Sequence, residues 1–390
     1  MSVTQRPLQL VNDVAFAPAG ARQADLSTSI EVARFVLVIG LVFLHYFGFP
    51  NGTASPFSGF DPERHQFATF VNSFVLFFFF SAVPLLSAVS GWLFFPTAET
   101  RIGQALHRRI LGRFRTLLLP LVIWNLAALL AALALHAAAP GNGFLPALGF
   151  DFDAAGALDY VNAVLGLTGL PIALQFWFVR DLFVTVLCSP LLWLLLRHAP
   201  LVGAAALGLV WLSGGTLGIF IRTDVLFFFY MGALARQSGL LPQLGLRPTL
   251  MLLAAYVLLV ALRAAAPAWL PAGSWTHQEQ ALELATRLIR PVGVLACWGL
   301  CLQIARSNWG RWVARYGGFA FFLHAAHYPL LPAVKFVLWR LVPAETDAWM
   351  LTHYAASVAL TVLLVFLSAQ LLFRLWPAGY SLLAGGRRLP

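Results

Sequence analysis

The segment SIEVARFVLVIGLVFLHYFGFP, residues 29–50, is long and apolar enough to cross a bilayer as a single helix. A hydrocarbon core of about 30 Å is spanned by roughly 20 helical residues. Three polar side chains interrupt this segment: Glu31, Arg34 and His45. A charged group at such depth costs a few kcal/mol on insertion scales, so it usually faces a cavity or a partner.

The whole chain resembles this segment in composition. Of its 390 residues, 60% are hydrophobic and 10% are charged, and the mean hydropathy is +0.80. Soluble domains carry about 25% charged residues, so the composition predicts an all-α polytopic membrane protein. The net charge is +10, but the arginines cluster between apolar runs, which is typical of membrane topology. We therefore expect the bilayer, and not nucleic acid, as the partner.

The length criterion predicts about ten transmembrane helices, and nine to eleven is the range that the pattern allows. The sixth candidate is short for a span, and the second is long enough to tilt. We expect a tail at 1–28, a transmembrane domain at 29–374 and a second tail at 375–390. The ten candidate spans are 29–49, 69–95, 116–137, 173–196, 200–219, 223–236, 249–267, 285–305, 316–340 and 350–373.

The arginines predict the orientation. The connection ETRIGQALHRRILGRFR, residues 99–115, is rich in arginine, whereas 138–172 carries aspartates and neither Lys nor Arg. By the positive-inside rule the first lies in the cytoplasm and the second outside. Alternating the spans from there places both termini in the cytoplasm. The N-terminal tail lacks the apolar core of a signal peptide, so the first helix is expected to insert uncleaved.

Cysteine and histidine spacing does not predict a metal centre. Cys188, Cys297 and Cys301 lie in apolar runs without CxxC spacing and are expected in the core. His324 and His327 are three residues apart and share a helix face, but a zinc site needs further ligands. We expect no metal and no bound cofactor.

Arg34 and His45 lie on one face of their helix. Eleven positions at about 100° each make three turns plus about 20°, and the axial separation is about 16 Å. Glu31 precedes Arg34 by three positions and can pair with it. Individually, Arg34 could snorkel to headgroups and His45 could cap a neighbouring helix. Together they predict a polar stripe that faces the interior of the bundle.

The Arg-x10-His spacing resembles the first helix of membrane acyltransferase family 3, whose members O-acylate bacterial surface sugars. Glu31 and Phe35 stand where that family usually has Asp and Gly, and His324 has no counterpart. Other stretches match in order: FFFFSAVPLLSAVSGWLFF (77–95) with Ser90-Gly91, GRFRTLLLPLVIW (112–124) with Arg113 and Arg115, LQFWFVRDLFVTVLCSPLL (174–192) with Trp177 and Arg180, FFFYMGALA (227–235), and GFAFFLHAAHYPLL (318–331) with His327 and Pro329.

The resemblance implies an acyltransferase that uses cytoplasmic acyl-CoA, most often acetyl-CoA, as co-substrate. A sugar hydroxyl needs a base, and His is the usual one, so His45 is the candidate base or transient acyl carrier. Arg34 is assigned to catalysis and, with Arg113 and Arg115, to the donor's phosphates, which suit the bidentate guanidinium. The candidate acceptor residues are Trp177, Arg180, His327 and Ser90, and Glu31 is the structural partner of Arg34.

Each assignment has a structural alternative. Arg113 and Arg115 could be topogenic charges, and Trp177 could belong to the interfacial aromatic belt. Arg180 and Asp181 are sequence neighbours and are expected to need separate partners.

For the whole protein, the rival functions are a transporter or flippase for a lipid-linked saccharide and a non-enzymatic partner of polysaccharide assembly proteins. The function favoured here is transfer of an acetyl group, at the periplasmic side of the bacterial inner membrane, to an exopolysaccharide or another cell-envelope glycan. The acceptor would be a saccharide or a lipid-linked saccharide.

Overall fold

The structure is a computed structural model that describes residues 23–52, 54–96, 101–139, 145–240, 243–271, 273–343 and 345–389. Within these ranges all regular elements are helices, which confirms the expected all-α class. Most of the predicted N-terminal tail lies outside the described residues.

The helices follow one another along the chain in this order. The first half forms α1 (Gln23–Leu44), α2 (Gln66–Phe79), α3 (Ala82–Phe94), α4 (Ile102–Arg113), the π-helix η2 (Phe114–Leu118), α5 (Leu119–Ala138), η3 (Leu145–Leu148), α6 (Ala157–Leu165), η4 (Leu174–Phe176), α7 (Trp177–Leu187) and α8 (Ser189–His198). The second half forms α9 (Pro200–Ser213), α10 (Asp224–Gln237), α11 (Leu246–Ala264), α12 (Ala266–Trp269), α13 (Gln278–Ala305), α14 (Asn308–Ala314), η5 (Arg315–Gly318), α15 (Ala320–Leu341), α16 (Asp347–Leu375) and α17 (Pro377–Leu383).

Seven helices of the described chain are long and apolar enough to cross a membrane, and the bent pair α7–α8, with an angle of 60°, would make eight. Each of the ten predicted ranges contains a helix, but α9 and α10 have only 14 residues each. The count of ten is therefore not confirmed. The helix from Ile102 to Ala138 has 37 residues, about 55 Å at 1.5 Å per residue, so its arginine-rich start extends beyond a hydrocarbon core.

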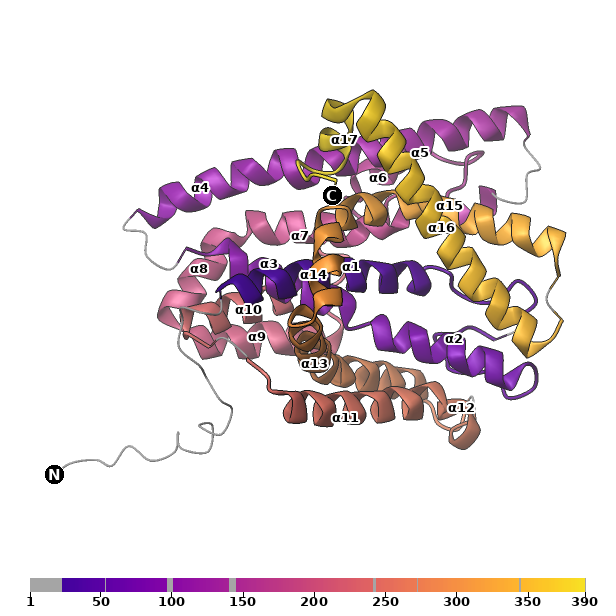
Figure 1. The fold of residues 1–390 in the computed structure, drawn as a ribbon, viewed down its shortest axis with the longest axis horizontal. Coiled ribbons are helices and arrows are strands. Elements are labelled where there is room, and N and C mark those ends of the chain that lie inside the picture. Colours follow the sequence, from indigo (N-terminus) through magenta and orange to yellow (C-terminus); the bar gives the residue numbers. More distant parts are fainter. Residues whose placement is uncertain are drawn as a thin grey trace.

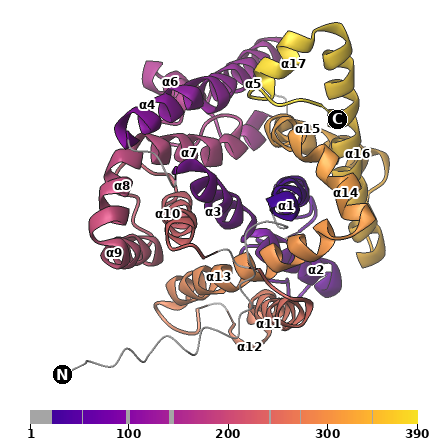
Figure 2. The ribbon, with the colours of Figure 1, turned by 60° about the vertical axis from the view of Figure 1, so that its left-hand side comes forward.

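The first helix lies inside the bundle. Figure 1 shows α1 running along the long axis of the molecule, and Figure 2 shows it enclosed by its neighbours. It packs against α2, α3, α13, α14, α15 and α16, and Val32, Ala33 and Val42 are completely buried. Much of the surface of α1 is therefore covered by other helices.

Two glycines allow α3 and α10 to approach closely. A Cβ at Gly91 would lie 1.9 Å from the carbonyl oxygen of Phe229, and a Cβ at Gly232 would lie 1.9 Å from that of Ala88. Small residues at helix interfaces permit such backbone contact in membrane proteins. This packing explains why the Ser90-Gly91 stretch and the FFFYMGALA stretch each contain a glycine.

Helix α15 is broken directly after His327. Tyr328 has non-helical dihedrals, and Pro329 and Pro332 lack the N–H groups that would bond to the carbonyls of Ala325 and Tyr328. The buried Gln175 side chain replaces both donors, with Nε2 donating to these two oxygens at 2.8 and 2.9 Å. The Gln175 amide thus supplies the hydrogen bonds that the two carbonyls lose at the kink, next to His327.

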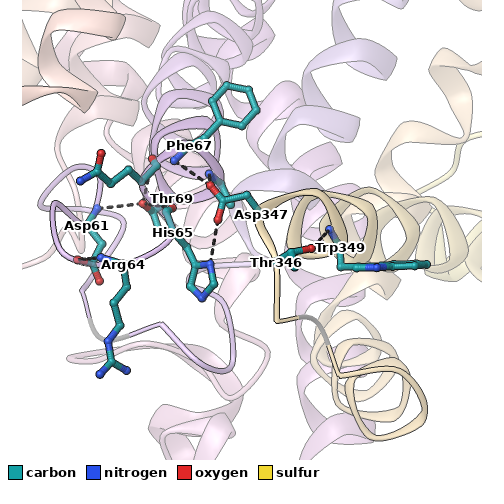
Figure 3. Close-up of polar contacts among 10 residues, drawn as sticks. Asp61, Arg64, His65, Phe67, Thr69, Thr346, Asp347 and Trp349 are labelled. Carbon is teal, nitrogen blue, oxygen red and sulfur yellow. Dashed lines mark hydrogen bonds and ion pairs between the residues drawn. The ribbon is translucent and has the colours of Figure 1, made fainter.

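At one end of the bundle, the first residue of α16 caps the N-terminus of α2. Asp347, the first residue of α16, accepts hydrogen bonds from the backbone N–H groups of Phe67 and Ala68 at 3.1 and 3.2 Å and contacts Nδ1 of His65 at 2.9 Å. Figure 3 shows His65 and Phe67 converging on this carboxylate. A carboxylate at a helix N-terminus satisfies free N–H groups and complements the helix dipole.

Candidate active site

Arg34 and Glu31 form the ion pair that their spacing predicts. The helix η5 covers this pair closely, because a Cβ at Gly317 would lie 2.0 Å from Oε2 of Glu31. Both side chains are half-buried, with about a third of their surface exposed. The close contact with η5 restricts the position of the Glu31 side chain. Arg34 also lines a cavity.

This cavity, which we call the arginine cavity, has a volume of about 120 Å³. Apolar residues of α1, α3, α7, α10 and α15 form most of its wall, and no acidic residue is among those that line it in the described chain. Its polar lining consists of Arg34, Ser90, Arg113, His324 and Arg387.

The three arginines give the cavity an excess of positive charge. Burial, together with the nearby guanidinium groups of Arg34 and Arg113, lowers the pKa of Arg387 to about 10, so Arg387 remains charged at neutral pH. Its guanidinium stacks on Phe321 at 4.4 Å and donates to the carbonyl of Ala384 at 3.1 Å. Arg113 makes no hydrogen bond to another described residue. Guanidinium groups with free donors suit an anion such as phosphate.

The neighbouring Arg115 does not share this position. Residues two positions apart on a helix point in nearly opposite directions, and Arg113 ends α4 where the π-helix η2 begins. Arg115 is exposed and is absent from the lining of the arginine cavity.

His45 and His327 form a hydrogen-bonded pair in the interior of the bundle. Nδ1 of His45 lies 2.7 Å from the carbonyl of Leu41 and 3.1 Å from Nε2 of His327. Nδ1 of His327 lies 3.1 Å from the carbonyl of Leu323. Because a carbonyl accepts only, each Nδ1 carries the proton, and Nε2 of His327 accepts from His45. Nε2 of His45 is then unprotonated, and no described residue donates a hydrogen bond to it.

His324 lies between this pair and the arginine cavity. It lines the cavity, and its ring centroid is 5.8 Å from that of His327, whose ring is 5.0 Å from that of His45. Three imidazoles therefore connect the cavity at Arg34 with His45. The polar stripe predicted from α1 continues through α15.

The predicted acceptor residues lie in two different surroundings. Arg180 is buried and donates to Asp181 at 2.7 Å and to the carbonyl of Leu167 at 2.9 Å. The expectation that Arg180 and Asp181 need separate partners is therefore wrong. Ser90 is on the arginine cavity and donates to the carbonyl of Leu86 at 2.8 Å.

Asp181 and Trp177 hold a further arginine, Arg222. The Asp181 carboxylate accepts from the backbone N–H groups of Ile221 and Arg222 at 3.2 and 2.8 Å. The Arg222 guanidinium lies over the Trp177 ring, 5.1 Å from its centroid. Its side chain is exposed. Arg222 and Trp177 thus form a cation on an aromatic ring at the start of α7.

A comparison with protein families identifies this arrangement. A family model described as an acyltransferase domain matches residues 27–370. The chain belongs to this acyltransferase family. The resemblance inferred from the Arg-x10-His spacing is confirmed, and the protein is an acyltransferase with several membrane-spanning helices.

The acyltransferase is also similar to a curated relative, the succinoglycan biosynthesis protein ExoH of Rhizobium meliloti (strain 1021). The two are 26% identical over 373 residues, which cover 93% of each chain. No solved structure matches the chain significantly.

Three residues at the candidate site are missing from the sequence-based assignment: Arg222, His324 and Arg387. His324 has no counterpart in the family pattern, although its position three residues before His327 places both on one face. Arg387 lies beyond the matched region 27–370 and resembles a topogenic charge. Arg222 stands in a short connection whose folding back onto α7 no local pattern predicts.

Proposed function

We propose that this protein transfers an acyl group, in the simplest case acetyl, from acyl-CoA to a hydroxyl of an exopolysaccharide or another cell-envelope glycan. The observation that carries the proposal is the continuous series of polar groups from the arginine cavity through His324 and His327 to His45. The name of the relative supports a saccharide acceptor, because that protein takes part in succinoglycan biosynthesis.

In this proposal the arginine cavity holds the phosphates of the donor. Arg34, Arg113 and Arg387 supply the cations, and Arg115 is left out because it does not reach the cavity. Ser90 lies on the same wall, which favours a donor contact over the acceptor role. The axial distance of about 16 Å between Arg34 and His45 suits a donor whose charged end stays at the arginines while its flexible arm reaches toward His45.

His45 acts as the base in this scheme. Nε2 takes the proton of the acceptor hydroxyl, the oxygen attacks the thioester carbonyl, and a C–O bond replaces the C–S bond. CoA leaves as a thiolate, and the proton held by His45 restores the thiol, so O–H is exchanged for S–H. The same Nε2 is the atom that would carry the acyl group if an acyl-histidine forms, and burst kinetics would distinguish the two routes.

The acceptor is assigned to the other end of the histidine series. Trp177 can stack on a sugar ring, and Arg222, which lies over Trp177, can bind an acidic or phosphate group of the acceptor. Arg180 then has a positioning role, because its donors serve Asp181 and backbone carbonyls. His327 orients His45 through its hydrogen bond.

We place the protein in the bacterial inner membrane, with the arginine cavity toward the cytoplasm and transfer at the periplasmic side. The positive-inside pattern supports this orientation. Polysaccharide assembly proteins are the expected partners. The transporter and flippase alternatives receive no support from the family match.

Mass spectrometry of surface glycans tests the proposal in strains with and without the gene, with the esters released by mild alkali. The gene should be needed for ester substituents, and wild type should restore them in the deletion strain. His45→Ala at normal expression should restore almost none, because loss of a general base costs about 10²–10⁴-fold in rate. Equal ester content with and without the gene would return the transporter to first place.

A further inference from the structure

His324 is buried, and within the described residues neither of its ring nitrogens makes a hydrogen bond of good geometry. The residue is 4% exposed, and the backbone of Gln175 lies near the ring without forming a well-aligned hydrogen bond with it. Leaving a buried polar group unsatisfied costs about 1–3 kcal/mol, and such groups are few in native proteins. An imidazole here needs an explanation other than the fold.

Packing alone does not call for histidine at this position. Its ring lies among aromatic rings, with centroids 6.0 Å from Phe176 and 5.9 Å from Phe178. A phenylalanine would fill a similar volume and would leave no polar atom unpaired. The polar atoms of His324 therefore favour a bound group.

The position of His324 indicates what that group is. It lines the arginine cavity, and it precedes His327 by one turn of α15 on the same face. A donor held by its phosphates at Arg34, Arg113 and Arg387 presents its reactive end to His324 before it reaches the His45–His327 pair.

We propose that His324 is a catalytic residue that donates an N–H to the carbonyl oxygen of the donor thioester. The inference rests on the proposed function and adds the group that stabilises the oxyanion. A neutral imidazole always carries one N–H and one lone pair, and a donor aimed at developing negative charge is among the largest contributions to acyl transfer.

The distances allow His324 and His45 to act on one carbonyl. The His327 ring lies 5.8 Å from the His324 ring and 5.0 Å from the His45 ring, so His324 and His45 are close enough to face one bound carbonyl group. Hydrogen bonds of about 3 Å at each end and an attack distance of about 3 Å bridge this gap. As the hydroxyl oxygen attacks, charge moves onto the carbonyl oxygen at His324, and it returns when the C–S bond breaks.

The test compares His324→Phe with wild type as purified full-length proteins. Thiol release from acetyl-CoA is measured with the glycan fraction of the deletion strain as acceptor, and melting temperature is measured in parallel. We expect kcat to fall about 10²-fold, KM for acetyl-CoA to stay within about threefold, and the melting temperature to stay equal or rise. His324→Gln, which keeps an N–H donor, should recover part of kcat.

His198→Phe, the same exchange at an exposed histidine, should leave kcat unchanged. Full activity of His324→Phe would overturn the inference and leave the proposed function intact. Parallel loss of kcat and melting temperature in both His324 variants would also overturn it in favour of a structural role. Absence of thiol release by the wild-type protein would overturn both proposals.

Discussion

Arg113 and Arg115 show at the scale of single residues how helix direction separates similar side chains. The sequence places both before the third predicted span, where either could bind a donor or mark the cytoplasmic face. Only Arg113 reaches the arginine cavity, while Arg115 is exposed. The difference arises because positions i and i+2 face opposite sides of a helix.

This difference predicts unequal effects of the same substitution. Arg113→Lys should raise KM for acetyl-CoA about tenfold with normal membrane insertion, because lysine keeps the charge and loses the bidentate fork. Arg115→Lys is the matched control and should leave KM unchanged. Kinetics of thiol release from acetyl-CoA in purified variants measure both. Equal effects at the two positions would contradict the assignment of Arg113 to the donor.

At the scale of elements, the broken helix α15 fixes the histidine pair. The His-x-Pro stretch predicts an interrupted helix, but it does not predict what replaces the missing N–H groups. Gln175, which lies 150 and 153 positions away from Ala325 and Tyr328, supplies both donors. The geometry of His327 therefore depends on η4 as well as on its own helix.

Gln175→Leu should destabilise the protein and impair catalysis together. Two buried carbonyls would lose their donor, at a cost of about 1–3 kcal/mol for each, and His327 would lose its fixed position beside His45. Melting temperature and kcat should both fall. A variant with normal kcat would show that the kink does not position the pair.

Asp347 provides a prediction for an element far from the chemistry. Asp347→Ala removes the carboxylate that accepts hydrogen bonds from the backbone N–H groups of Phe67 and Ala68 and contacts the His65 ring (Figure 3). The loss of such a cap costs about 1 kcal/mol, so the melting temperature should fall. Thr346→Ala, at the N-cap next to it, removes a single bond to Trp349 and should have a smaller effect. If both variants lowered the melting temperature equally, the contacts of Asp347 with α2 would contribute no measurable stability.

At the scale of the whole molecule, the unequal distribution of arginine predicts the membrane orientation. An introduced cysteine at Ser274, expected outside, should react with an impermeant maleimide in intact cells. One at Ser238, expected inside, should react only after the cells are opened. Both side chains are exposed, and the wild-type protein, with three native cysteines, gives the background. The reverse labelling pattern would invert the proposed donor and acceptor sides.

Helix positions and the polar stripe of α1 follow from the sequence because they depend on local properties. Hydropathy over about 20 residues locates spans, and the repeat of the helix places Glu31, Arg34 and His45 relative to one another. The family assignment followed from such local patterns as well. Local patterns did not show that the predicted second span is two helices broken near Phe80 and Ser81.

Only the tertiary structure decided which side chains meet. It joined His45 to His327 and placed His324 and Arg387 on the cavity of Arg34. It also paired Arg180 with its neighbour Asp181, because a long side chain held by packing can fold back onto its own helix. Contacts between residues hundreds of positions apart depend on how helices pack and bend, and the periodicity of one helix carries no information about its partner.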